Sequence, residues 1–232
     1  MRTAGRKEDA TVLRTPITVT AAAAALALLT ACGPVQMGAA ATVGSTGISA
    51  STLNSEVKNL NQAIAASHGR IQLQFPAART PQAVLSWLIR FQVQDRLAAR
   101  RHITVTRADT QLALRQASAQ ARQSGVTFAA LAAANGLPPD LLNAYGRYRA
   151  IGNKLVSQLD QGNLPTSQAG LQALGKEFGT LQCRAAKSLN IQVNPQFGQL
   201  SYTQLTVVPA ASALSAPEGG RAGQGPQPAP AC

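Results

Sequence analysis

The apolar positions along most of the chain recur at intervals of three and four residues, which is the spacing of one face of an α-helix. The clearest example is formed by Leu53, Val57, Leu60 and Ile64. A serine-rich stretch at residues 49–51 comes directly before this face, and serine is a favoured N-cap residue. The pattern therefore predicts an amphipathic helix that starts near residue 50.

Start and stop signals predict two further helices in the middle of the chain. Thr80-Pro81 is typical of an N-cap followed by proline at the first helical position. This helix is expected to end at Arg100-Arg101, where cations suit the helix dipole. Thr106 and Asp109 have capping-box spacing and predict a helix that runs to about residue 124. Its expected apolar face is weak and consists of Leu112, Ala113, Gln116 and Ala117.

The remaining elements follow from shorter signals. Residues 128–134 predict a short helix stopped by Asn135-Gly136, and Pro138-Pro139-Asp140 opens the next helix. Residues 167–189 predict the last helix. Extended pieces are expected at residues 41–43, 191–193 and 204–208. The predicted fold class is mainly α, with one helical domain over residues 41–208 and a minor β element formed by the N- and C-terminal segments.

The two ends of the chain differ from this helical region. Residues 1–31 have the basic start, the apolar run and the small residues of a secretory signal peptide, and residues 32–40 are predicted to be a tether. Residues 209–232 are rich in proline, glycine, alanine and serine and contain hardly any large apolar side chain. Such a segment buries too little surface to fold, so a disordered tail is predicted.

The signal peptide ends in Leu29-Thr30-Ala31-Cys32-Gly33, which resembles the lipobox of bacterial lipoproteins. This resemblance implies cleavage before Cys32 and a diacylglyceryl group on its sulfur. The protein would then be lipid-anchored at the outer, extracytoplasmic face of the cell membrane. An ordinary signal peptide, or a short core segment with a buried cysteine, is the alternative. The apolar run is shorter than the roughly 20 residues that a membrane span needs.

The charge of the chain is strongly positive. It has 21 lysines and arginines, nine aspartates and glutamates, and a net charge of +12. Removal of residues 1–31 takes away four basic and two acidic residues, which leaves 17 − 7 = +10. A protein with this charge favours anionic partners such as lipid headgroups, acidic wall polymers or acidic polypeptides. Export, and the scarcity of aromatic residues near the arginines, argue against nucleic acid.

No catalytic or metal-binding pattern is visible in the sequence. His68 and His102 lie in unrelated segments without Cys, Asp or Glu at ligand spacing, and no Gly-x-Ser-x-Gly elbow occurs. We therefore expect no enzyme activity, no metal, no cofactor and no small-molecule substrate. Cys183 and Cys232 would be a possible pair in an oxidising compartment. Whether they form a disulfide depends on geometry, which the sequence leaves open.

Four segments, taken in order, resemble the N-terminal chaperone domain of the SurA family. Residues 41–49 are similar to its opening strand–turn–helix start, although Ser45-Thr46-Gly47 replaces the usual Asn-Gly. Residues 88–106 resemble its second helix and the Gly-Ile-x-Val-Thr exit, with His102 where glycine is common. The other two segments are Thr127-Phe128-Ala129-Ala130-Leu131-Ala132 with Asn135-Gly136-Leu137, and residues 185–198, which contain Val193-Asn194-Pro195-Gln196-Phe197-Gly198.

The resemblance implies a SurA N-terminal or trigger-factor-like helical domain that binds unfolded or partly folded exported polypeptides without ATP. Relatives often insert a parvulin-type prolyl isomerase domain before the closing helix, but here only residues 162–168 separate the helices. The candidate polypeptide contacts are aromatic residues with arginines around them: Trp87, Phe91, Phe128, Tyr145, Tyr148, Arg90, Arg96, Arg147 and Arg149. For each of them, ordinary core packing or a solvated surface position is the competing interpretation. The alternative function is a scaffolding envelope lipoprotein that binds an anionic wall polymer or a partner protein through its basic surface.

Overall fold

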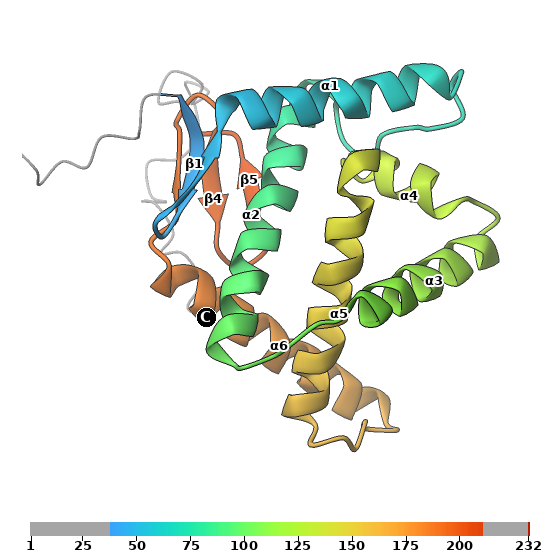
Figure 1. The fold of residues 1–232 in the computed structure, drawn as a ribbon, viewed down its shortest axis with the longest axis vertical. Helices are drawn as coiled ribbons and strands as arrows, with labels where there is room; N and C mark the ends of the chain where they lie inside the picture. The colour runs from blue at the N-terminus through green and yellow to red at the C-terminus, as the bar shows by residue number, and fades with distance from the viewer. Residues whose placement is uncertain (1–37, 211–231) are drawn as a thin grey trace, which may run out of the picture. The chain divides into compact units, whose positions relative to one another are not determined.

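The structure is a computed structural model that describes residues 38–210 and Cys232. The predicted signal peptide, Cys32, most of the tether and residues 211–231 of the predicted tail lie outside the described residues. In the described part the chain forms six α-helices, two short 3₁₀-helices and five short strands (Figure 1). The predicted mainly helical class is therefore confirmed, and so is the minor β content.

The strands form two small antiparallel sheets. In the first, the central strand β1 pairs with β2 on one side and with β3 on the other, and Ala41 lies opposite Val193. In the second, β4 pairs with β5. The five strands are β1 (Ala39–Val43), β2 (Thr46–Ser49), β3 (Gln192–Val193), β4 (Gln199–Ser201) and β5 (Thr206–Val208). The pairing of β1 with β3 confirms a β element built from the two ends of the domain, whereas β2 and β4 were not predicted.

Helix α1 (Ala50–Ala66) forms where the apolar spacing predicts it. The Ser49 side chain caps it by accepting a hydrogen bond from the backbone N–H of Thr52 at 2.9 Å. Leu53 and Leu60 are fully buried. One face of α1 is thereby fixed against the core, and α1 contacts α2.

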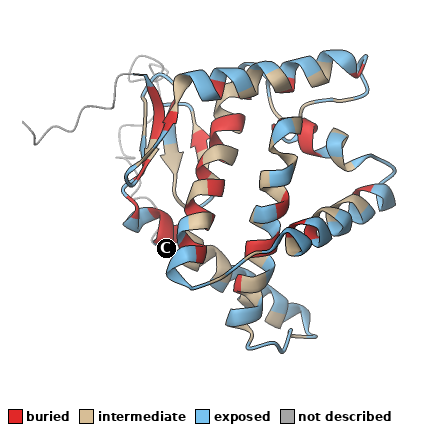
Figure 2. Ribbon diagram, viewed as in Figure 1, coloured by how far each residue is buried: buried red, intermediate tan, exposed pale blue. Residues whose placement is uncertain are grey.

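Helix α2 (Thr80–Arg100) carries much of the core, and Figure 2 shows buried positions along its length. Its start differs from the prediction. A 3₁₀ turn, η1 (Ala77–Arg79), comes first, so Thr80 belongs to the helix and Arg79 occupies the N-cap position. The Thr80 hydroxyl donates backwards to the carbonyl oxygen of Ala77 at 2.7 Å, which is why it does not cap the helix.

Two buried polar side chains of α2 bond to other elements. The Gln94 side chain donates from Nε2 to the carbonyl oxygen of Tyr148 and accepts from Gln182 Nε2, both at 2.7 Å. The Ser86 hydroxyl accepts from the backbone N–H of Val207 at 2.8 Å. These bonds join α2 to α5, α6 and β5. They also give both buried polar side chains of α2 a hydrogen-bond partner.

Helix α3 (Arg107–Gln123) begins with the predicted capping box. The Thr106 N–H donates to Asp109 Oδ2 at 2.8 Å, and the Asp109 N–H donates to Thr106 Oγ1 at 3.1 Å. The predicted apolar face is wrong in part, because Leu112 is 49% exposed and Gln116 is also exposed. The helix instead turns Leu114 inward, towards α5.

The last three helices form in the regions predicted for them, but the second starts later than its predicted signal. Thr127 caps the first of them, Gly136 ends it with a φ of +79°, and Ser167 caps the third. A 3₁₀ turn, η2 (Pro139–Leu141), stands where Pro138-Pro139-Asp140 was expected to open a helix directly. The helices are α4 (Phe128–Ala134), α5 (Leu142–Leu159) and α6 (Gln168–Ser188).

Cys183 and Cys232 form a disulfide, with 5.7 Å between their Cα atoms. Cys183 lies on the buried side of α6, and its partner is the last residue of the chain. The pairing that the sequence left open is therefore made in the structure. It closes a loop that contains β3, β4 and β5.

Within the described residues, none of the helices combines the length and the apolar character that crossing a bilayer requires.

Candidate functional site

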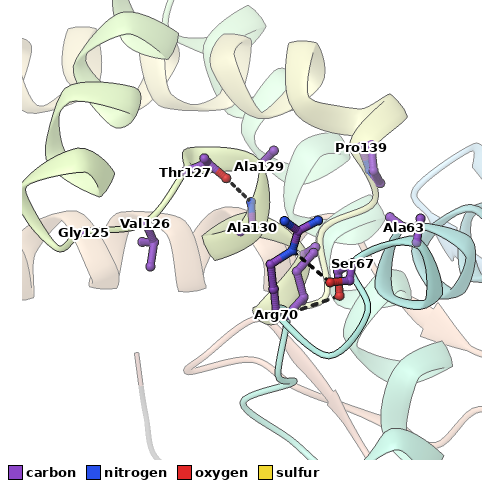
Figure 3. Close-up of a pocket in the computed structure, with 12 residues that line it drawn as sticks. Ala63, Ser67, Arg70, Gly125, Val126, Thr127, Ala129, Ala130 and Pro139 are labelled. Atoms are coloured by element: carbon purple, nitrogen blue, oxygen red, sulfur yellow. Dashed lines mark hydrogen bonds between the residues drawn. The ribbon is translucent and has the colours of Figure 1, made fainter.

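An open groove of about 600 Å³ lies between the end of α1, the loop that follows it, the α3–α4 loop and α4 (Figure 3). We call it the α1–α4 groove. Five of its twelve lining residues are alanine and one is glycine. Side chains of this size leave space that a larger side chain from another molecule can enter.

Helix caps hold both walls of the groove in place. On the α1 side, the Ser67 hydroxyl donates to the carbonyl oxygen of Ile64 at 2.7 Å and accepts from the Ile71 N–H at 3.1 Å. On the α4 side, Thr127 Oγ1 accepts from the Ala130 N–H at 3.2 Å. These local bonds set the backbone, so the groove does not depend on a ligand for its shape.

Arg70 is the one charged residue among those that line the groove. Its Nε donates to the carbonyl oxygen of Ser67 at 3.0 Å, which directs the guanidinium group towards α4 (Figure 3). The two Nη groups make no hydrogen bond or ion pair with the described residues. The groove therefore combines small apolar walls with a positioned cation that has free donors.

An exposed apolar side chain extends the groove surface. Val126 lines the groove and is 41% exposed. Ile71 and Pro139 supply further apolar surface at intermediate exposure. Contact with these groups would remove apolar area from water on both partners.

The five aromatic residues proposed from the sequence lie together in one cluster between α2, α4 and α5. Trp87 lies at the centre, with ring centroids 5.6 Å from Tyr145 and 5.8 Å from Phe91. Phe128 is 5.3 Å from Tyr145, and Tyr148 is 5.7 Å from Phe91. These distances are typical of favourable aromatic pairs.

The aromatic cluster is partly closed to solvent. Phe91 is buried at 9% exposure, whereas Trp87, Phe128, Tyr145 and Tyr148 are half-buried. Trp87 Nε1 donates to the carbonyl oxygen of Asn135 at 3.0 Å, and burial raises the pKa of the Tyr145 hydroxyl. The cluster therefore anchors α4 to α2 and α5. A polypeptide-binding role for its exposed edge stays a prediction.

Helix α4 lies between the aromatic cluster and the groove. Phe128 and Ala132 belong to the cluster, while Ala129, Ala130 and Ala133 line the groove. At about 100° per residue, these two sets occupy different sides of the helix. The aromatic cluster thus supports the helix from behind and fixes the α4 wall of the groove.

The structure places the four candidate arginines in separate surroundings. Arg90 donates to the carbonyl oxygens of Leu205 and Gln204, both at 3.1 Å, and its guanidinium lies 4.9 Å from the Trp87 ring centroid. Burial lowers the pKa of Arg90. The others are Arg96, bonded to Thr46 at 2.6 Å; Arg147, paired with Asp95 at 2.9 Å; and Arg149, exposed on α5.

Arg90 is therefore a structural link between α2 and the β4–β5 hairpin. Its two hydrogen bonds and the stacking on Trp87 account for its position. The role of the four arginines in binding polypeptides stays a prediction.

Metal binding finds no support in the described residues. Within residues 38–210 and at Cys232, no three His, Cys, Asp or Glu side chains gather closely enough to hold a metal ion. His68 and His102 are exposed and occupy left-handed turns, with φ of 50° and 53°.

Sequence reasoning missed the groove residues, above all Ala63, Arg70 and Val126. The available signal was the high alanine content of residues 63–66 and 129–134. Alanine favours a helix, but its small side chain fills little space beside the helix. The two stretches face each other only in the tertiary structure, so the spacing of residues along the chain could not predict the groove.

Comparison with known proteins yields no relative: no protein-family model, no curated protein and no solved structure matches the chain.

Proposed function

We propose that the protein is a lipid-anchored, extracytoplasmic binder of unfolded or partly folded exported polypeptides. It acts without ATP and without catalysis, and its helical domain is of the SurA N-terminal type. The observation that carries this proposal is the α1–α4 groove, an open hollow of about 600 Å³ with mainly alanine, glycine and short aliphatic walls. An unfolded chain exposes large apolar side chains, and the small side chains of the groove leave space for them.

The chemistry of the groove suits a broad range of polypeptides. Small walls impose few shape requirements, so burial of apolar area supplies the attraction at about 25 cal/mol per Å². Folded partners keep their large apolar residues inside, whereas unfolded partners expose them. The apolar walls of such a groove therefore favour unfolded over folded chains and do not require a particular order of apolar residues.

The anchor completes the proposal. Leu29-Thr30-Ala31-Cys32-Gly33 has lipobox character and follows a basic start and an apolar run. A diacylglyceryl group with a further acyl chain holds a protein firmly at a membrane. The binder would then stay at the surface where exported chains emerge. A clickable palmitate analogue should label the wild type in a bacterial host, and Cys32→Ser should abolish that labelling.

The binding function is tested by aggregation of a client. The mature chain, produced with Cys32→Ser to keep it free of lipid, is added to reduced, unfolded α-lactalbumin, and light scattering is followed. We expect suppression at near-stoichiometric ratios. Ala129→Trp places an indole in the groove and should weaken the suppression of aggregation. Ala119→Trp, on the exposed side of α3, should leave the suppression unchanged. If the wild type neither suppresses aggregation nor binds the client, the proposed function is wrong.

A second candidate function has one specific observation in its favour. With Arg221 and Glu218 set aside, residues 38–210 hold 17 − 1 = 16 basic and 7 − 1 = 6 acidic residues. Two of the basic residues, Arg107 and Arg147, line a hollow of about 510 Å³ between the start of α3 and α5. A scaffold that binds anionic wall polymer would use this charge. Salt-sensitive capture of purified wall polymer, with no preference for unfolded protein, would favour it.

A further inference from the structure

We propose that the α1–α4 groove selects polypeptide segments in which a carboxylate lies beside large apolar side chains, and that Arg70 binds the carboxylate. This inference rests on the proposed function and specifies its substrate class. It assigns a specificity-determining role to a residue that the candidate contacts from the sequence do not include.

One hydrogen bond orients the exposed side chain of Arg70. Its Nε bond to the Ser67 carbonyl leaves the two Nη groups as donors at the groove wall. A guanidinium group with both Nη groups free matches the two oxygens of a carboxylate. Ser67 itself is 7% exposed and bonded to both Ile64 and Ile71, so the loop that carries Arg70 is held at its base.

Apolar groups surround this cation on the other sides. Val126, Ile71 and the alanines of α1 and α4 line the same hollow. A segment with a carboxylate alone would leave the apolar walls in water, and a purely apolar segment would leave the exposed guanidinium hydrated and gain no attraction from it. A segment with a carboxylate and large apolar side chains matches both the guanidinium and the apolar walls. This complementarity favours such a segment as the bound polypeptide.

The charges near the groove also restrict where the carboxylate lies. No acidic residue lines the groove, but Asp140 follows Pro139 at one end of it. Burial and, to a smaller extent, the negative charge of Asp140 raise the pKa of Glu56 on α1. Asp140 itself makes that end less favourable for a further negative charge. The carboxylate of the bound segment therefore lies at the Arg70 end, away from Pro139.

Other occupants fit less well. A second copy of this chain carries a net charge of +10 after removal of residues 1–31, so it repels the first. An anionic wall polymer would reach Arg70 but has no large apolar side chains for the alanine walls. Basic apolar segments would bring a like charge to the guanidinium.

The test compares three labelled peptides of equal length in fluorescence anisotropy. Each carries Leu and Phe at the same positions in a Gly/Ser frame, with glutamate, glutamine or lysine at the two positions between them. The protein is the full mature chain with Cys32→Ser. We expect the glutamate peptide to bind about fivefold more tightly than the glutamine peptide, and the lysine peptide to bind most weakly. The glutamate advantage should shrink in 0.5 M salt.

Charge reversal assigns the preference to one residue. Arg70→Glu should abolish the glutamate advantage and favour the lysine peptide, while Arg115→Glu, a matched reversal at an exposed position of α3, should preserve the wild-type order. Circular dichroism and thermal melts would verify that both variants are folded.

The outcomes separate the two levels of the proposal. Equal binding of all three peptides to the wild type, or an unchanged order in Arg70→Glu, overturns the carboxylate preference and leaves polypeptide binding standing. No binding of any peptide, together with no effect on client aggregation, overturns the proposed function itself. A preference that Arg115→Glu removes as fully as Arg70→Glu would mean a general charge effect and would also overturn the role of Arg70.

Discussion

Leu114 of α3 lies directly against Gly146 of α5, so closely that a Cβ atom on the glycine would stand 2.6 Å from Leu114 Cγ. Gly146 is buried, and α3 and α5 form one of the main helix pairs of the domain. The missing side chain on α5 is thus what admits the leucine of α3. This contact fixes which face of α3 turns inward.

This packing predicts that Gly146→Ala destabilises the protein by about 1–3 kcal/mol, because a methyl group must displace Leu114. Alanine in a helix normally stabilises by up to about 1 kcal/mol relative to glycine, so the sign of the change is diagnostic. Gly175→Ala in α6 is the matched control, since a Cβ there would meet nothing within 4 Å. Urea denaturation of the two variants should give changes of opposite sign, and stabilisation by Gly146→Ala would contradict the contact.

The disulfide supports a second prediction. Cys183 and Cys232 are separated by 49 positions, and a cross-link over a loop of this length stabilises a protein by about 4 kcal/mol through the unfolded chain. Reduction should therefore lower the free energy of unfolding by about 4 kcal/mol, which is measured as a lower guanidinium concentration at the unfolding midpoint. Cys232→Ser should start at the lower midpoint and should not respond to reductant. If the wild type is equally stable with and without reductant, the bond contributes nothing to stability.

The helices could be predicted from the sequence because their signals are local. Ser49, Thr106, Thr127 and Ser167 each precede a helix by one residue and bond to its first turn, so the start of the helix is visible in four consecutive residues. Thr80 failed as a cap because the residues before it coil into a 3₁₀ turn that attracts its hydroxyl.

What the sequence could not predict depends on partners that lie far away along the chain. Leu114 rather than Leu112 faces inward because Gly146 lies in a helix 32 positions later, a separation that helical periodicity does not report. Arg90 was named from the sequence only as a candidate polypeptide contact, and its bonds to the carbonyl oxygens of Leu205 and Gln204, which span more than a hundred positions, could not be predicted. The α1–α4 groove likewise exists only once α1 and α4 lie together.

The hydrogen bond between the buried Gln94 amide on α2 and the half-buried Gln182 amide on α6 predicts a non-additive response to mutation. Gln94 is 1% exposed and accepts a hydrogen bond from Gln182. Gln94→Leu should cost about 1–2 kcal/mol, because the half-buried Gln182 amide loses its acceptor. The double variant Gln94→Leu/Gln182→Leu should recover part of that loss, since no donor is then left unpaired. A double-mutant cycle by chemical denaturation measures the coupling, and strict additivity would show that the two amides do not interact.

The capping box of α3 predicts a specific dependence of stability on pH. The hydrogen bonds of Asp109 to Lys154 and Thr106 lower the pKa of its carboxyl from 3.8 to about 2. A carboxyl whose pKa is lower in the folded than in the unfolded chain stabilises the fold above the unfolded value, and this contribution is lost as the pH falls through the folded value. The wild type should therefore be more stable than Asp109→Asn at pH 6. The difference should shrink below pH 3.8 and vanish near pH 2.

Urea denaturation from pH 2 to pH 6 measures this difference directly. Glu177→Gln is the control, because Glu177 is exposed on α6 and makes no hydrogen bond or ion pair with the described residues. Its stability should follow the wild type across the range. Lys154→Met should remove much of the pH dependence of stability that Asp109→Asn removes. The reason is that Lys154 Nζ lies 2.7 Å from Asp109 Oδ2 and its hydrogen bond is the largest cause of the lowered pKa. An Asp109→Asn difference that persists unchanged at pH 2 would mean that the side chain acts through its shape and not through its charge.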